Sequence, residues 1–210
     1  MSSPPTPAAV PDQRLFTTVA RLAARHEGRF SPETVQRLLT DSYTRLAATA
    51  HVRTHLVVLA ERLTTERLDA LANTQSPSDG GRPRVLFVCS HNAGRSQLAA
   101  ALLTHRAGGD VQVSSAGTAP TGEIDPGVLQ ALTEIGADVS DAYPKPLTDD
   151  VVQAADVVVT MGCGDACPVV TGRRYLDWPV ADPDGAPIAV VRAIRDEIDA
   201  HITALLADLS

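Results

Sequence analysis

Cysteine is scarce in this sequence, which has three cysteines, Cys89, Cys163 and Cys167, among its 210 residues. So small and odd a number excludes a framework of structural disulfide bonds. It favours instead a reducing compartment, where free thiols take part in chemistry. We therefore expect a cytoplasmic protein whose cysteines are reactive.

The sequence also lacks an excess of positive charge and any long apolar run. Its 18 Lys and Arg residues are outnumbered by 25 Asp and Glu residues, and the formal net charge is −7. A non-specific nucleic-acid binder needs clustered basic residues, so we expect no nucleic-acid partner. No run of 18 apolar residues offers a membrane span, and the first residues lack the pattern of a signal peptide, so we expect no membrane association.

Helical periodicity dominates residues 12–73, where apolar residues recur at spacings of three and four. Three such series predict a small three-helix bundle. The first series includes Leu15, Val19 and Leu22, the second Val35, Leu38, Leu39 and Leu46, and the third Val52, Leu56, Leu59, Leu63, Leu68 and Leu71. Ser31-Pro32-Glu33 is typical of a helix start. We expect residues 1–11 to be disordered and residues 74–83 to be a linker, because Ser, Gly and Pro are frequent there.

Residues 84–210 alternate strand and helix patterns and are expected to form the catalytic domain. Strands are predicted at 85–88, 111–115, 156–161 and 174–178, and helices after residue 95, at 126–135 and at 187–206. This order predicts an α/β fold with a four-stranded parallel sheet and flanking helices. Ligands of such sheets bind beyond the carboxyl ends of the strands, where Cys89 and Met161 lie.

The segment from Cys89 to Ser96 joins the first predicted strand to a helix and is the most informative part of the sequence. Backbone N–H groups converge where a tight loop enters a helix, and the helix dipole favours an anion there. Cys89 can act as a nucleophile at the base of such a loop, while Arg95 can grip two oxygens of a tetrahedral oxyanion. The residues expected to bind the anion are Ser90, His91, Asn92, Ala93, Gly94, Arg95 and Ser96. The alternative is a buried structural cysteine at a strand end.

These residues resemble the low-molecular-weight protein tyrosine phosphatases and their arsenate reductase branch. The resemblance extends to the sequence 114–118, Ser-Ser-Ala-Gly-Thr, and to Asp182-Pro183, in the order found in that family. It implies that Cys89 attacks the oxyanion, Arg95 binds it, and Asp182 protonates the departing oxygen. It also implies that Ser115 supports the loop from the neighbouring strand.

Cys163 and Cys167 follow the third predicted strand, where a phosphatase needs no thiols. Thioredoxin-coupled arsenate reductases resemble this chain in having such a pair there. The resemblance implies that Cys163 resolves the Cys89 adduct, that Cys167 attacks the resulting disulfide, and that thioredoxin reduces the final Cys163–Cys167 bond. A metal site or inert packing are the alternatives, although zinc would need further ligands that nearby residues do not supply.

Two departures from the family narrow these expectations. Ala100 stands where related reductases carry an acidic residue that helps to bind potassium, so we expect no metal, and no resident cofactor either. Asp184-Gly185 follows Asp182-Pro183, where related tyrosine phosphatases place an aromatic residue against the substrate ring. This substitution favours arsenate, with phosphate and sulfate as analogues, over phosphotyrosine.

Several functions stay open at this point. The leading hypothesis is a thioredoxin-coupled arsenate reductase; a mycothiol-coupled reductase and a low-molecular-weight phosphatase are alternatives, and a non-catalytic oxyanion sensor is another. Similar helical extensions precede the catalytic domain in some actinobacterial arsenate reductases, which this chain resembles. We expect the helical segment to serve packing or to form a homodimer.

Overall fold

The computed structural model describes residues 14–50, 54–75, 81–164 and 167–209. The chain separates into two compact units, Met1–Ala72 and Asn73–Ser210, which are taken here one at a time. The prediction of disorder for residues 1–11 and the position of Val52 lie outside the described residues. Within the described ranges, no helix has the length and apolar character needed to cross a membrane.

The first unit contains the three predicted helices, α1 (Leu15–Arg25), α2 (Pro32–Thr49) and α3, which runs from Leu56 to Gln75. Ser31 caps α2 as its sequence predicts, because its hydroxyl accepts a hydrogen bond from the Thr34 N–H at 3.3 Å. The apolar series meet in a small core. Its buried members are Leu22, Val35, Leu38 and Leu68.

A buried arginine of α3, Arg67, forms hydrogen bonds to α2 beside this core. Arg67 donates to Asp41 at 2.6 Å and to the hydroxyl of Ser42 at 3.1 Å. Arg45 adds a second hydrogen bond to Asp41 at 2.9 Å. Burial raises the pKa of Asp41, but the hydrogen bonds and charges of the two arginines outweigh this effect and lower it overall. The carboxylate therefore stays ionised, which a buried guanidinium requires.

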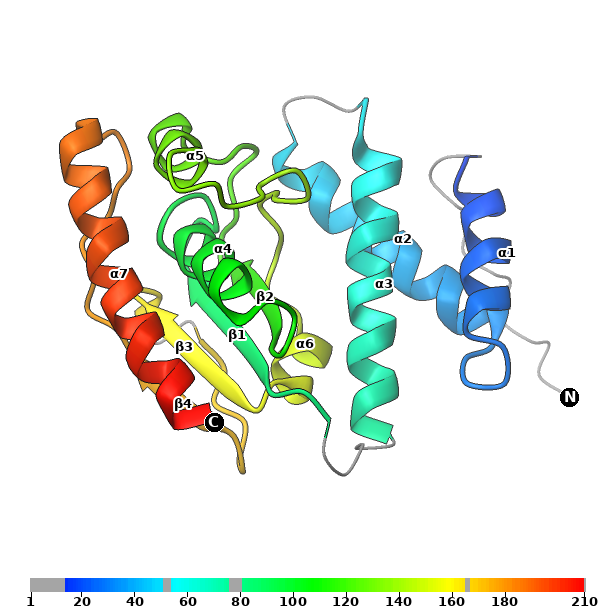
Figure 1. Cartoon of the computed structure of the whole chain (residues 1–210). Coiled ribbons are helices and arrows are strands. Elements are labelled where there is room, and N and C mark those ends of the chain that lie inside the picture. Colours follow the sequence, from blue (N-terminus) through cyan, green and yellow to red (C-terminus); the bar gives the residue numbers. More distant parts are fainter. Residues whose placement is uncertain (1–13, 51–53, 76–80, 165–166, 210) are drawn as a thin grey trace, which may run out of the picture. The chain divides into compact units, whose positions relative to one another are not determined.

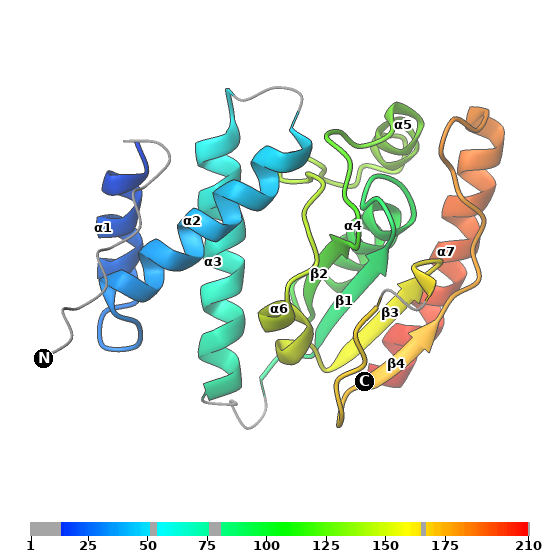
Figure 2. The same cartoon turned by 180° about the vertical axis from the view of Figure 1, so that it is seen from behind.

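The second unit is built on a parallel sheet, as predicted. Its strands are β1 (Arg84–Cys89), β2 (Gln112–Gly117), β3 (Val157–Met161) and β4 (Arg174–Asp177), in the order β2-β1-β3-β4. Its helices are α4 (Arg95–Ala107), α5 (Pro126–Thr133), α6 (Asp149–Ala154) and α7 (Ile188–Leu209). Figure 1 looks onto the side of the sheet that α4 and α7 cover, and Figure 2 shows the sheet from behind.

Successive side chains of a strand point to opposite faces of the sheet, and each face carries its own apolar cluster. Val85, Phe87 and Cys89 face the cluster formed with α4, α5 and α7. Leu86 and Val88 face the other side, where they meet Val152 of α6 among others. The central strand β1 is thus buried on both faces, which explains its continuous apolar run. Trp178, just after β4, packs against Phe87 with ring centroids 5.6 Å apart and so belongs to the core.

The structure differs from the sequence prediction in a few element boundaries and in one helix. Helix α6 was not predicted, because its six residues are too short to show a periodic pattern. The second strand extends to Gly117 rather than ending at residue 115, since Gly117 pairs with Cys89 in the sheet register. These differences leave the predicted fold class unchanged.

The ion pair between α5 and α7 predicts a specific acid sensitivity. Arg192 donates to Glu134 at 2.8 and 2.6 Å, and these hydrogen bonds lower the Glu134 pKa from 4.5 to about 2. A carboxylate with a lowered folded-state pKa stabilises the fold fully above the unfolded pKa and loses this effect as the pH falls from 4.5 towards 2. We expect Glu134→Gln to lower the melting temperature at pH 6, and by a smaller amount at pH 3.5.

Thermal unfolding at both pH values measures this effect. Glu197→Gln removes the same charge from an exposed site on α7 and serves as the control. An equal loss of melting temperature at the two pH values for Glu134→Gln would contradict the assignment.

Candidate active site

Cys89 ends β1 at the carboxyl rim of the sheet, between Gly117 of β2 and Met161 of β3. It is a free thiol and 2% exposed. The chain then turns through residues 90–94, here called the anion loop, and Gly94 starts α4. The nucleophile candidate therefore lies at the base of a loop that opens a 13-residue helix.

Hydrogen bonds from a neighbouring segment turn the carbonyl groups of this loop outward. The N–H groups of Thr118, Ala119, Thr121 and Asp125 donate to the carbonyl oxygens of Cys89, Ser90, His91 and Ala93, at 3.2, 2.8, 3.1 and 3.1 Å in that order. In a peptide unit the N–H points opposite to the C=O. The N–H groups of the loop are thereby directed to its inner side, where they can bind an anion.

Asn92 holds the turn of the loop and is completely buried. Its φ of 50° lies in the left-handed region, and its N–H donates to the Cys89 sulfur at 3.2 Å. Its side-chain oxygen accepts from the backbone N–H of Lys145 at 2.9 Å, so its amide nitrogen must face the opposite way. That nitrogen donates to the Ser96 hydroxyl at 2.8 Å.

The orientation of Asn92 determines where the Ser96 hydroxyl proton goes. Ser96 Oγ accepts from Asn92, and it lies 2.9 Å from Cys89 Sγ. A hydroxyl has one proton to donate, and here that proton can be directed to the sulfur. The sulfur of Cys89 is thus contacted by both the Ser96 hydroxyl and the Asn92 N–H.

Gln97 was not among the residues selected from the sequence, yet it holds this network together. Its side-chain nitrogen is buried and lies 3.0 Å from the Asn92 carbonyl oxygen, 3.2 Å from Asn92 Oδ1 and 3.0 Å from the carbonyl oxygen of Tyr143. The local sequence offers no signal for this role, because Gln97 follows Arg95 and Ser96 at the polar start of the helix. The partner Tyr143 is 46 residues away, which no local pattern indicates.

Arg95 lies at the start of α4 with its side chain 11% exposed. Its Nη2 donates to Asp182 Oδ2 at 2.7 Å, while its buried Nε has no hydrogen-bond partner among the described residues. An unpaired buried donor beside inward N–H groups is a position for an acceptor such as an oxyanion. The structure thus brings Arg95 and Asp182 together, although 87 positions separate them in the sequence.

The loop that carries Asp182 packs closely over the start of α4. A Cβ atom at Gly94 would lie 2.6 Å from Pro183 Cγ, so only glycine fits beneath the proline. Asp182 itself is half-exposed and can exchange protons with solvent. Ser115 lies in β2 opposite Phe87, two residues before the end of the strand. The hydrogen bonds to the anion loop described above come from residues after Gly117 instead.

Cys163 and Cys167 form a disulfide with a Cα–Cα distance of 6.2 Å. Gly162 and Gly164 have φ values of 71° and 53°, in the left-handed region that glycine adopts without steric cost. Cys163 is 8% exposed and packs in the cluster around Leu86 and Val88, on the sheet face opposite to that of Cys89. Cys167 is less deeply buried.

Gly162 joins the disulfide segment to the anion loop. Its carbonyl oxygen accepts from the Ser90 hydroxyl at 3.0 Å. The Arg95 guanidinium lies directly against it, and a Cβ atom at this position would collide with Arg95 Nη1. The residue before Cys163 is therefore in contact with both the loop and its arginine.

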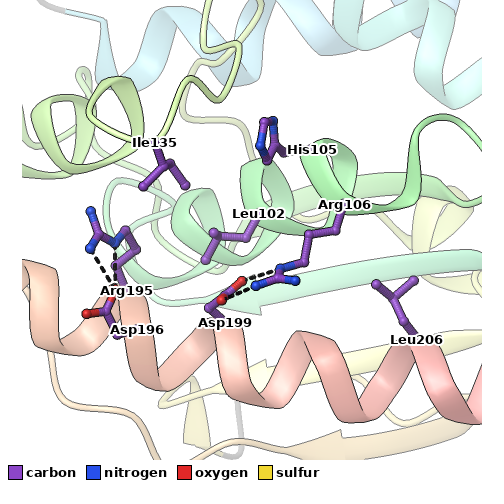
Figure 3. A pocket seen from close by; sticks show the side chains of 8 residues that line it. All are labelled: Leu102, His105, Arg106, Ile135, Arg195, Asp196, Asp199 and Leu206. Carbon is purple, nitrogen blue, oxygen red and sulfur yellow. Dashed lines mark hydrogen bonds and ion pairs between the residues drawn. The ribbon is translucent and has the colours of Figure 1, made fainter.

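A separate groove of about 560 Å³ lies between α4 and α7 (Figure 3). It has an apolar part formed by Leu102, Ile135 and Leu206, and a charged part formed by His105, Arg106, Arg195, Asp196 and Asp199. Arg106 pairs with Asp199 and Arg195 with Asp196, so these charges compensate one another. None of the anion-loop residues lines this groove. Among the described residues, no three His, Cys, Asp or Glu side chains are grouped so as to hold a metal ion.

Comparison with known proteins identifies both parts of the chain. Residues 15–72 match the protein-tyrosine-phosphatase-like N-terminal domain. A solved thioredoxin-dependent arsenate reductase from Corynebacterium glutamicum is 47% identical, with a TM-score of 0.84, over 93% of this chain and 96% of its own. An arginine phosphatase from Geobacillus stearothermophilus is 30% identical, with a TM-score of 0.53, over 60% of this chain and 92% of its own.

Curated relatives match more than half of this chain. The glutaredoxin arsenate reductase of Synechocystis is 31% identical over 60% of this chain and 98% of its own length. Arsenate reductase 1 of Bacillus cereus is 34% identical over 56% of this chain and 90% of its own length. Residues 84–210, which carry the anion loop, Asp182 and both further cysteines, match the low molecular weight phosphotyrosine protein phosphatase model. The chain therefore belongs to the low molecular weight phosphotyrosine protein phosphatase family.

Proposed function

We propose that this protein is an arsenate reductase that uses three thiols in sequence and is regenerated by thioredoxin. The observation that carries the proposal is the Cys163–Cys167 disulfide, which begins one residue after the glycine on which Arg95 lies. A phosphatase of this fold needs the anion loop and a general acid but has no use for a second and third thiol. A redox pair whose preceding residue, Gly162, contacts both Ser90 and Arg95 fits the reduction of an oxyanion bound in the loop.

Arsenate would bind in the anion loop, as would its analogues phosphate and sulfate. The inward N–H groups of residues 90–94 and the guanidinium of Arg95 provide donors to a tetrahedral anion, and the start of α4 adds a favourable dipole. Binding the anion requires Arg95 to share its charge between the ligand and Asp182, which lies 2.7 Å away. Protonation of Asp182 at this step would both release Arg95 and supply a general acid.

The proposed chemistry uses the three thiols one after another. The Cys89 thiolate attacks arsenic, and Asp182 protonates the oxygen that leaves. Cys163 attacks the sulfur of the adduct, so that the electron pair of the sulfur–arsenic bond stays on arsenic and arsenite departs. Cys167 attacks Cys163 in the new Cys89–Cys163 disulfide, which frees Cys89 and forms the Cys163–Cys167 bond that the structure contains. Two electrons pass from the thiols to arsenic.

Thioredoxin is the donor that we propose for the last step. The solved arsenate reductase that is 47% identical is thioredoxin-dependent, whereas the relative from Synechocystis is named for glutaredoxin. Mycothiol remains the small-thiol alternative. A cycle that must regain three free thiols suits a reducing compartment, which supports the expectation of a cytoplasmic protein.

For the helical unit, residues 12–73, we propose a role in packing or in forming a homodimer. Phe16 of α1 and Val58 of α3 are 56% and 51% exposed and offer apolar surface for such a contact.

Replacing the nucleophile should abolish every activity. We expect Cys89→Ser to lower both arsenate reduction and the slow hydrolysis of p-nitrophenyl phosphate by about a thousandfold or more, because the hydroxyl is a far weaker nucleophile than the thiolate. Cys167→Ser is the control and should keep the slow hydrolysis. Steady-state assays with both substrates, together with thermal unfolding to verify the fold, measure this. Comparable hydrolysis in Cys89→Ser would place the nucleophile elsewhere.

Variants that lack one of the two resolving thiols should stop at different steps of the proposed cycle. With arsenate and no donor, Cys167→Ser should release a stoichiometric amount of arsenite and stop as a Cys89–Cys163 disulfide, whereas Cys163→Ser should release little arsenite. The parent should end with Cys163–Cys167. Mass spectrometry of unreduced peptides and arsenite quantification measure these products. Full multiple turnover with thioredoxin in either variant would rule out the three-thiol sequence.

A further inference from the structure

Val169, two residues after Cys167, has the most exposed large apolar side chain in the described part of the chain. Its exposed fraction is 83%, compared with 56% for Phe16, 51% for Val58 and 45% for Val190. The next residue, Val170, turns inward and packs against the apolar cluster that contains Cys163. The segment thus presents one apolar side chain outward beside a disulfide.

Tyr175 of β4 fixes the backbone on both sides of Val169. Its hydroxyl donates to the Pro168 carbonyl oxygen at 2.9 Å and accepts from the Val170 N–H at 2.9 Å. The Tyr175 hydroxyl therefore binds the backbone groups immediately before and after Val169, while the Val169 side chain stays exposed.

The two sulfur atoms of the disulfide differ in access. Cys163 is 8% exposed and packs against the sheet, whereas Cys167 lies at the edge of the same cluster and is only partly buried. A thiolate must approach along the axis of the sulfur–sulfur bond, with the leaving sulfur on the far side. Attack on Cys167 with Cys163 leaving is the direction that this burial favours. Val169 is two residues from Cys167 in the sequence.

We propose that Pro168 and Val169, the Val169 patch, form the surface on which thioredoxin docks to reduce the Cys163–Cys167 disulfide. This inference rests on the proposed function, since it assumes that thioredoxin is the electron donor. The patch places an exposed apolar side chain on a backbone segment that Tyr175 already holds, so docking of a protein partner would order little additional chain. A small thiol would need no such surface.

The reduction at this patch balances as a dithiol–disulfide exchange. One thioredoxin thiolate attacks Cys167 Sγ, the Cys163–Cys167 bond breaks, and Cys163 leaves as a thiolate that takes up a proton. The second thioredoxin thiol then attacks the thioredoxin sulfur of the mixed disulfide, and Cys167 leaves. Thioredoxin is oxidised to its disulfide, and both cysteines of this protein are reduced by two electrons in total.

The decisive experiment is steady-state arsenate reduction by Val169→Asp at varied thioredoxin concentration. We expect the KM for thioredoxin to rise about tenfold with kcat nearly unchanged, because a desolvated charge at the centre of an interface opposes association. Val190→Asp places the same charge on another exposed valine, on α7, and should keep the parent's KM. Tyr175→Phe keeps the ring and removes the hydroxyl that holds the segment, so we expect a smaller rise of about threefold.

Turnover with dithiothreitol distinguishes weaker thioredoxin docking from damage to the active site, because a small dithiol can reduce the disulfide without docking on a protein surface. Val169→Asp should keep the parent's rate with dithiothreitol and the parent's melting temperature. A parent-like KM for thioredoxin in Val169→Asp, or an equal loss with both reductants, would overturn the proposal. Loss of self-association with an unchanged KM would also overturn it and assign the patch to a second copy of this chain. If thioredoxin supports no turnover even in the parent, the proposed function itself fails.

Discussion

The outward hydrogen bonds of the anion loop are the constraint on which the rest of the active site depends. Four backbone N–H groups from residues 118–125 hold the carbonyl oxygens away from the centre, and the loop's own N–H groups then face inward. Asn92 makes this possible by adopting a φ of 50°, a conformation that costs a non-glycine residue roughly 1 kcal/mol. Its hydrogen bonds to Ser96, Gln97 and Lys145 offset that cost. The same bonds direct the Ser96 hydroxyl to Cys89, so loop shape and thiol reactivity have one physical origin.

The sequence allowed the loop to be predicted because its signals are local. An apolar strand, a cysteine, a short turn and a helix start lie within the span 84–96, and chain geometry places their N–H groups together. The supports of the loop could not be predicted in the same way. The donors from Thr118 to Asp125, and the carbonyl of Tyr143 that Gln97 contacts, are brought in by the parallel pairing of β1 with β2 and by the loop after α5. Helix α6 is an intermediate case, since Thr148-Asp149-Asp150 resembles a helix start but six residues show no periodicity.

The change of direction after β3 places Cys89 and Cys163 on opposite faces of the sheet, because simple strand alternation beyond Met161 would put Cys163 on the face of Cys89. Cys89 belongs to the cluster covered by α4 and α7, whereas Cys163 packs against Leu86 and Val88 on the other face. A disulfide between Cys89 and Cys163 therefore requires the chain after Met161 to cross the carboxyl end of the sheet. Gly162 and Gly164, both with positive φ, are the residues at which such a change of direction meets the least steric resistance. In the oxidised form, Cys89 is a free thiol on one face of the sheet, while Cys167 of the disulfide is only partly buried and can be reached by a reductant.

Gly162 couples the oxyanion part of the site to its redox part. Its carbonyl accepts from Ser90 in the anion loop, and the guanidinium of Arg95 occupies the space that a side chain at this position would take. Cys163 follows directly, so it cannot move towards Cys89 without changing the contacts of Arg95. Arg95 in turn is paired with Asp182, whose proximity is secured by Pro183 over Gly94. In the proposed cycle, binding of the anion, protonation of Asp182 and movement of Cys163 would therefore all act on the same guanidinium. Each of these steps would change what Arg95 can bind next, which would link the oxyanion chemistry to the thiol exchange that follows it.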